Sequence, residues 1–168
     1  DTALLVKLTS GGALDPAFSL DGYATYQPNS NESFTTQSAG TGGSGAIYVC
    51  GLQSTAGAEA AVIRVRANGT VDGFATEASN TGCVDLVLDA TSATYAHVDG
   101  GGVTRIVAVD QGTMADPTIF SLDFSNNVNG WLSDSVLCIA GTGPYYLGGY
   151  ADAVAAEVPD REAHERIA

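Results

Sequence analysis

The apolar positions of this chain fall in short runs separated by turns rich in Gly, Ser and Thr. Three times, an apolar run, a polar turn and a run carrying a tyrosine follow one another, over residues 34–51, 84–98 and 136–149. Short β-branched and aromatic runs between such turns are typical of strands. The pattern therefore predicts hairpins of antiparallel strands, whose tyrosines fill the gaps between neighbouring sheets. These tyrosines are Tyr48, Tyr95 and Tyr146.

A second kind of segment is repeated between the hairpins. Residues 5–15 read Leu-Val-Lys-Leu-Thr-Ser-Gly-Gly-Ala-Leu-Asp, and residues 62–72 read Val-Ile-Arg-Val-Arg-Ala-Asn-Gly-Thr-Val-Asp. A weaker third copy covers residues 105–114. We expect the glycine of each turn to adopt positive φ or to allow close backbone approach. These glycines are Gly12, Gly69 and Gly112.

Each unit is thus expected to be a three- or four-stranded meander that buries its apolar face only by stacking on its neighbours. The sequence predicts an all-β fold of repeated antiparallel meanders, forming a β-propeller or propeller-like blades. About three units make up a repeat domain over residues 1–150. Residues 151–168 are denser in charge and are expected to form a tail, with a short helix or an extended arm.

The copied segments resemble the delta-60 repeat family of bacterial propellers. Blades of that family carry an apolar strand followed by an Asn/Asp-Gly-Ser/Thr-Leu-Asp-x-x-Phe turn. Residues 8–18 fit this turn best and residues 66–74 fit nearly as well, whereas the third copy shifts its acid to Asp116. The resemblance covers most of residues 3–150 in diffuse form. It implies a fold and little about chemistry.

Assembly is suggested by the strands at the two ends of the repeat. The first strand is apolar at alternate positions (Leu4, Val6 and Leu8), and no hairpin partner precedes it. The third unit, residues 136–150, lacks a clear third strand. Because an unpaired edge is a template for another strand, we expect the first strand to complete the sheet of the third unit. A donor in the same chain would close a ring, and a donor in a neighbouring copy would build a filament.

Composition narrows the classes of function. The chain has 168 residues and a net charge of −13, which makes binding to nucleic acid phosphates or to anionic membranes unfavourable. Its apolar runs are all shorter than a membrane span requires. Lys7 is the single lysine, and Gly, Ser, Thr and Asn are plentiful. This composition is typical of a β-rich protein that is extracellular or on the cell surface.

Two kinds of covalent modification are suggested by short motifs. Asn31 and Asn68 begin Asn-x-Ser/Thr sequons, the acceptors of N-glycosylation. The chain has 3 cysteines, so at most one disulfide forms within one molecule. Cys50 with Cys138 is the first expectation because both lie in apolar strands of the repeat.

Other chemistry-bearing residues favour structural roles. His97 occupies the tyrosine-strand position held elsewhere by Cys50, and is expected to pack between sheets rather than to bind a metal with it. Trp131, in a loop before the third unit, is the candidate for contact with a ligand or partner, and the tyrosine row is an alternative sugar-stacking surface. No cofactor is expected. Calcium is the alternative, and it would use scattered acids. These acids are Asp85, Asp89, Asp99, Asp110 and Asp116.

The sequence therefore predicts a non-enzymatic extracellular structural protein, a subunit of a surface assembly or filament. Its partners would be copies of itself or other extracellular proteins. The alternative is a propeller module that binds carbohydrate or protein. An enzyme ranks third, because no acid–base pair is seen to converge.

Overall fold

The computed structural model describes residues 2–54, 57–79, 82–99 and 103–115, and the backbone of the strands at 118–122, 137–140 and 146–149. The elements in this part of the chain are all strands, and every strand pair is antiparallel. The predicted all-β fold of antiparallel meanders is confirmed. Trp131 and residues 151–168 lie outside the described residues. The strands are β1 (Ala3–Val6), β2 (Tyr23–Tyr26), β3 (Ser33–Thr41), β4 (Ile47–Ser54), β5 (Ala58–Val65), β6 (Val71–Ala78), β7 (Asp85–Leu88), β8 (Ser92–Val98), β9 (Thr104–Asp110), β10 (Thr118–Leu122), β11 (Leu137–Ala140) and β12 (Tyr146–Gly149).

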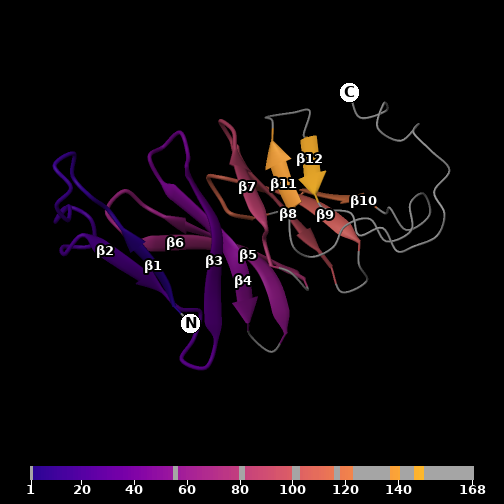
Figure 1. Cartoon of the computed structure of the whole chain (residues 1–168), viewed down its shortest axis with the longest axis horizontal. Helices are drawn as coiled ribbons and strands as arrows, with labels where there is room; N and C mark the ends of the chain where they lie inside the picture. The colour runs from indigo at the N-terminus through magenta and orange to yellow at the C-terminus, as the bar shows by residue number, and fades with distance from the viewer. Residues whose placement is uncertain are drawn as a thin grey trace.

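The strands form two four-stranded meanders flanked by two hairpin-sized sheets. The order is β3-β4-β5-β6 in the first meander and β10-β9-β8-β7 in the second, while β1 pairs with β2 and β11 pairs with β12. Figure 1 shows β1 and β2 at one end of the molecule, the β3–β6 sheet beside them, and the remaining strands at the other end. The described sheets form no closed ring, so a propeller is not confirmed.

The two central strands of the β3–β6 sheet, β4 and β5, are buried on both faces. On one face, Val49, Ile63 and Val65 pack with Ala3 and Phe18 from the N-terminal segment. The opposite face packs against the β7–β10 sheet. Alternate residues of a strand point to opposite faces, so a strand buried on both sides reads as a continuous apolar run. This explains the sequence Ala-Ala-Val-Ile in β5, whose residues 60–63 are all fully buried.

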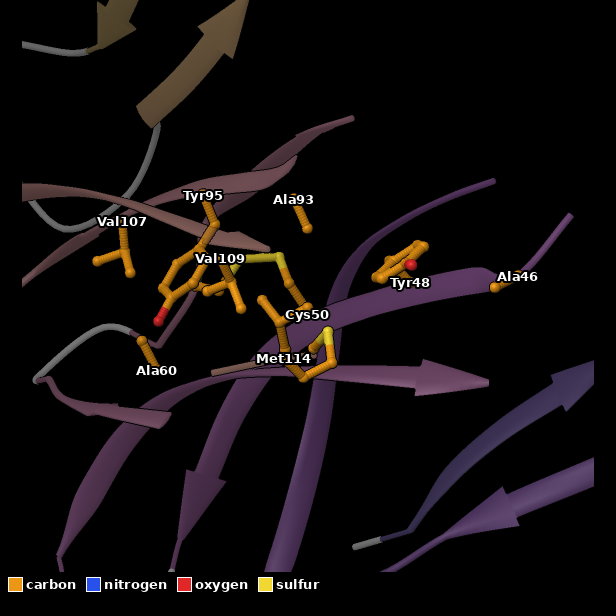
Figure 2. Packing of buried hydrophobic residues seen from close by; sticks show 11 residues of the cluster. Ala46, Tyr48, Cys50, Ala60, Ala93, Tyr95, Val107, Val109 and Met114 are labelled. Atoms are coloured by element: carbon orange, nitrogen blue, oxygen red, sulfur yellow. A yellow bond between two sulfur atoms is a disulfide. The ribbon is translucent and has the colours of Figure 1, made fainter. Parts of the chain in front are cut away.

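The interface between the two meanders holds the larger of the two apolar cores. Tyr48 in β4 and Tyr95 in β8 are almost completely buried there, together with Val107 and Val109 from β9. Figure 2 shows Tyr95 and the two valines gathered with Cys50 in one cluster. Each tyrosine lies on the second strand of its meander, so the predicted equivalence and burial of these two are confirmed. Tyr146 lies on β12, the second strand of its hairpin, and its side chain is outside the described residues.

The same two tyrosines also distinguish this arrangement from a propeller. Identical blades repeated around an axis would put equivalent side chains into successive gaps. Here both tyrosines enter one gap, and the Tyr48 hydroxyl donates to the Gln111 carbonyl of the other sheet at 3.0 Å. The two meanders therefore meet with equivalent faces inward, as the sheets of a sandwich do.

The first two copied segments have the same turn. In each, the backbone amide at the start of the turn donates to a carbonyl four residues later, and the glycine amide donates back to the starting carbonyl. Gly12 and Gly69 have φ of +81° and +87°, as expected. The bonds are Thr9 N to Ala13 O, 2.8 Å; Arg66 N to Thr70 O, 2.8 Å; Gly12 N to Thr9 O, 3.0 Å; and Gly69 N to Arg66 O, 2.8 Å.

The third copy departs from this geometry. Gly112 lies in the turn after β9, but the positive φ, 55°, falls on Met114 instead. The Asp110 carboxylate accepts bonds from the Gly112 and Thr113 amides and organises a different turn. Gly112 therefore lies in a turn, as predicted, but shows neither positive φ nor close backbone approach: the atom nearest to an added Cβ is the Asp110 carboxylate oxygen, at 3.1 Å. A side-chain cap replaces the glycine geometry.

The disulfide differs from the expectation. Cys50 of β4 is bonded to Cys83, which precedes β7, with a Cα–Cα distance of 5.5 Å and 33 residues of sequence separation. The predicted Cys50–Cys138 pairing is wrong. Cys83 lies next to Cys50 because its backbone amide donates to the Gly51 carbonyl at 3.0 Å, which brings the segment after the first meander back across β4.

Reducing the Cys50–Cys83 bond, or replacing Cys83 by Ser, is expected to lower the free energy of unfolding by about 3–4 kcal/mol, from the entropy of closing a loop of this length. Urea unfolding of oxidised and reduced protein measures this difference. Mass analysis of denatured, unreduced protein should show alkylation at Cys138 alone, and the variant Cys138→Ser should keep the bridge. Alkylation of all three thiols would contradict the bridge.

The two turn glycines give a matched pair for testing the local geometry. Gly12→Ala should cost about 1 kcal/mol, because an L-residue is strained at positive φ while the site around it is open. Gly69→Ala should cost at least about 1 kcal/mol more, because an added Cβ would lie 2.8 Å from the Ser19 Cβ and 2.9 Å from its nitrogen. Equal losses in thermal unfolding would contradict the close approach of Ser19.

Candidate association surface

Exposed apolar side chains are concentrated near the start of the described chain. Of seven large apolar side chains exposed in the described residues, six lie between residues 4 and 23. Leu4, Val6 and Leu8 alternate along the first strand, with 62%, 52% and 56% of their surface exposed. Tyr23 pairs with Val6 and Leu14 pairs with Leu8, and paired residues share a face of a sheet. We name these five residues the N-terminal apolar face.

The repeat explains why this face is apolar. In the aligned copies, Leu4, Val6 and Leu8 correspond to the β5 residues Ala61, Ile63 and Val65. Those three are completely buried, because the β1–β2 sheet and Phe18 cover them. The N-terminal apolar face is therefore the equivalent, in the first repeat, of the buried face of β5, and no described sheet covers it.

The other side of β1 is anchored in the protein. Ala3 is buried against the β3–β6 sheet, and Leu5 and Ala24 pack with it. Lys7 forms an ion pair with Asp15 at 2.9 Å, as Arg64 does with Asp72 in the next repeat. Because Ala3 and Leu5 are packed in the core, the alternate side chains of β1 have to point outward.

The loop between the two strands presents a further apolar side chain. Leu20 has 92% of its surface exposed, and both Ser19 and Leu20 have positive φ, 54° and 71°. The loop is held by Phe18, which is fully buried, and by a 2.7 Å bond from the Ser19 amide to the Asn68 carbonyl. Strained backbone with a rigid anchor occurs where a side chain must be presented in one position. Sequence reasoning missed Leu20, since no pattern marks a lone leucine in a loop.

The pairing of the first strand contradicts one part of the assembly prediction. β1 pairs with β2, and not with β11 or β12, so closure of the third sheet by the first strand of the same chain is wrong. Completion by a neighbouring copy stays a prediction. Each of β1 and β12 has one strand partner among the described residues, which leaves one edge of each without a described partner.

The acids considered for calcium do not converge. Asp89 and Asp110 cap separate turns through backbone amides, and Asp99 pairs with Arg105. Asp85 accepts from the Ser38 hydroxyl at 3.3 Å, and Asp116 lies outside the described residues. Within the described ranges no three His, Cys, Asp or Glu side chains gather as a metal site would require.

His97 packs between sheets, as expected for a structural residue. It is fully buried in β8, stacks on Tyr95 with 6.0 Å between ring centres, and neither ring nitrogen has a hydrogen-bond partner among the described groups. Burial lowers the pKa of His97, and the charge of Arg105 adds to this, while Asp99 opposes it. Cys50 is held in the disulfide, so the pair does not offer a metal site.

The sequons lie at accessible places. Asn31 and Asn68 are both exposed, and the Asn68 side chain accepts from the Thr70 amide at 3.1 Å. Their exposure is compatible with glycosylation, which stays a prediction.

The described part of the chain contains no helix of the length and apolarity needed to cross a bilayer.

Comparison with known proteins adds no relative. No family model matches the chain, and neither the curated proteins nor the solved structures contain a match. The resemblance to the delta-60 repeats stays a prediction. The function has to be inferred from the surfaces and residues described above.

Burial of His97 makes a pH-dependent stability testable. Because its pKa is lower in the folded than in the unfolded protein, the unfolded state takes up the proton first, and stability should fall as pH drops below about 6.5. Asp15, Asp72, Asp89 and Asp110 have lowered pKa values, so their contribution is lost only in more acidic solution. Urea unfolding between pH 7.5 and 5 should therefore report mainly His97, at up to about 1.4 kcal/mol per unit of pKa difference.

The control is His97→Leu, which removes the titrating ring from the same position. Its stability should be nearly constant over this pH interval. A variant that keeps the full pH dependence would show that another group is responsible.

Proposed function

We propose that the protein is a non-enzymatic structural subunit that assembles with copies of itself through the N-terminal apolar face and the edge of β1 that has no described strand partner. The observation that carries the proposal is the exposure of Leu4, Val6 and Leu8, whose repeat equivalents Ala61, Ile63 and Val65 are covered by a neighbouring sheet. Apolar patches of this kind mark interaction surfaces.

The proposed partner surface is the β11–β12 sheet of a second copy. Each described meander has four strands, and the tyrosine-bearing strand is the second. The β1–β2 sheet carries the copied turn of the third and fourth strands, and β12 carries a tyrosine, as the second strand does. The two small sheets are therefore complementary halves of one meander, and pairing β12 with β1 would complete it.

The register of this pairing follows from the first meander. Tyr48 of β4 lies opposite Arg64 of β5. Tyr146 and Lys7 are their equivalents in the repeat, so we expect these two residues to face each other across the new strand pair. Repetition of a head-to-tail contact that does not close gives a filament, and one that closes gives a ring.

The proposed setting is extracellular or on the cell surface. The buried Cys50–Cys83 disulfide supports an oxidising compartment, as do the exposed sequons. The net charge of −13 would keep the remaining surface soluble, and would confine association to the apolar face.

The double variant Leu4→Asp/Val6→Asp tests the proposal. Both side chains are exposed, so the fold should survive, while burying two carboxylates in the interface should weaken self-association by more than about a hundredfold. Sedimentation velocity across a concentration series measures the effect. Deleting the whole strand is a poorer test, because Ala3 and Leu5 belong to the core.

Phe74→Asp is the matched control, since Phe74 is equally exposed but lies on β6. It should assemble as the unmodified protein does. A protein that stays monomeric at every concentration, or a double variant that assembles normally, would refute self-assembly through this face.

A further inference from the structure

A hollow of about 540 Å³, lined by polar and apolar groups, lies between the β3–β6 sheet and the turn that follows β9. None of the residues of the N-terminal apolar face lines it, so its role is independent of the proposed assembly. Its polar lining comes from the β3–β4 turn, the turn between β5 and β6, and the turn after β9. These residues are Ser44, Arg64, Arg66, Asn68, Asp72 and Gln111.

The lining of the hollow carries two arginines and one carboxylate. Arg64 and Arg66 share that carboxylate, which belongs to Asp72. A second carboxylate, that of Asp110, accepts from the amide of the lining residue Gly112, and the charge of Arg64 contributes to lowering its pKa. The arginines are responsible for lowering the pKa of Asp72, so this carboxyl stays ionised, with no proton to donate.

The two arginines have different roles. Arg64 is largely buried, and all three of its guanidinium nitrogens donate within the protein. Its Nε and Nη2 donate to Asp72, and its Nη1 donates to the carbonyls of Gln111 and Gly112. Arg66 donates to Asp72 through Nε alone, and 64% of its side chain is exposed. Its two terminal nitrogens have no partner among the described residues.

Two acceptor groups in the lining already accept hydrogen bonds. The Asn68 side-chain oxygen accepts from the Thr70 amide, and the Gln111 backbone carbonyl accepts from Tyr48 and Arg64. The donors that remain for a ligand are the two terminal nitrogens of Arg66, which have no partner among the described residues. A ligand that fits this set brings acceptors and a negative charge.

We propose that the hollow is a binding site for a carboxylate group. A carboxylate presents two coplanar oxygens that match the paired N–H donors of a guanidinium. Its single charge also limits repulsion from the acidic chain, which disfavours more highly charged anions. The group can come from a uronic acid sugar or from an acidic amino-acid side chain, because both present the same carboxylate.

Titration of the isotope-labelled protein, followed by amide NMR shifts, tests the site with four probes. Glucuronate and the α-amide of N-acetylglutamate carry one carboxylate each, whereas glucose and the α-amide of N-acetylglutamine are their neutral counterparts. Saturable shifts are expected in residues 66–70 and 111–113 with the acidic probes. Arg66→Gln should weaken binding by about tenfold or more, and Arg66→Lys, which keeps the charge but not the fork, should weaken it less.

Arg105→Gln is the control, because Arg105 pairs with Asp99 outside the hollow. It should bind as the unmodified protein does. Binding of glucuronate alone would assign the site to acidic sugars, and binding of both acidic probes would assign it to carboxylates in general. Neutral probes that bind equally well, no saturable shift at about 50 mM, or full binding by Arg66→Gln would overturn the proposal.

Discussion

The burial of β4 and β5 on both faces of the β3–β6 sheet is the constraint on which the rest of the structure depends. A sheet apolar on two sides is stable only between two other layers, so the N-terminal segment has to cover one face and the β7–β10 sheet the other. The Cys50–Cys83 bond and the Tyr48 hydroxyl contact lie within the second of these interfaces. The positions of the turns and of the hollow follow from the same stacking.

The repeated segments share their local turn geometry, but the sheets that contain them pack in different ways. The first two copies share a turn, a positive-φ glycine and a cation–carboxylate pair, because all of these depend on residues close together in sequence. The third copy has an aspartate cap, and its sheet presents the tyrosine face back to the first meander. One sequence pattern thus gives two kinds of sheet packing. The β1–β2 and β3–β6 sheets stack in the same orientation, whereas the β3–β6 and β7–β10 sheets meet with equivalent faces together.

The two proposed surfaces arise from this stacking in different ways. The N-terminal apolar face is an interface of the repeat that lacks a described cover, so its chemistry is that of a core side chain placed in water. The hollow arises where Arg64 is drawn across to the turn after β9, which leaves Arg66 with only part of its guanidinium engaged. The first surface suits a sheet of the same kind, and the second suits a small charged group.

The sequence by itself determined the all-β fold, the hairpins, the turns at Gly12 and Gly69, and the alternation that makes Leu4, Val6 and Leu8 one face. These features depend on strand periodicity and on backbone geometry within a few residues. Only the tertiary structure decided that Cys50 meets Cys83, that Tyr48 and Tyr95 share one gap, and that Arg66 and Gln111 line one hollow. Each of these contacts joins residues far apart in the chain, and it forms only because particular sheet faces cover each other. The local preferences of the strands are compatible with several such packings, so the sequence pattern does not select one.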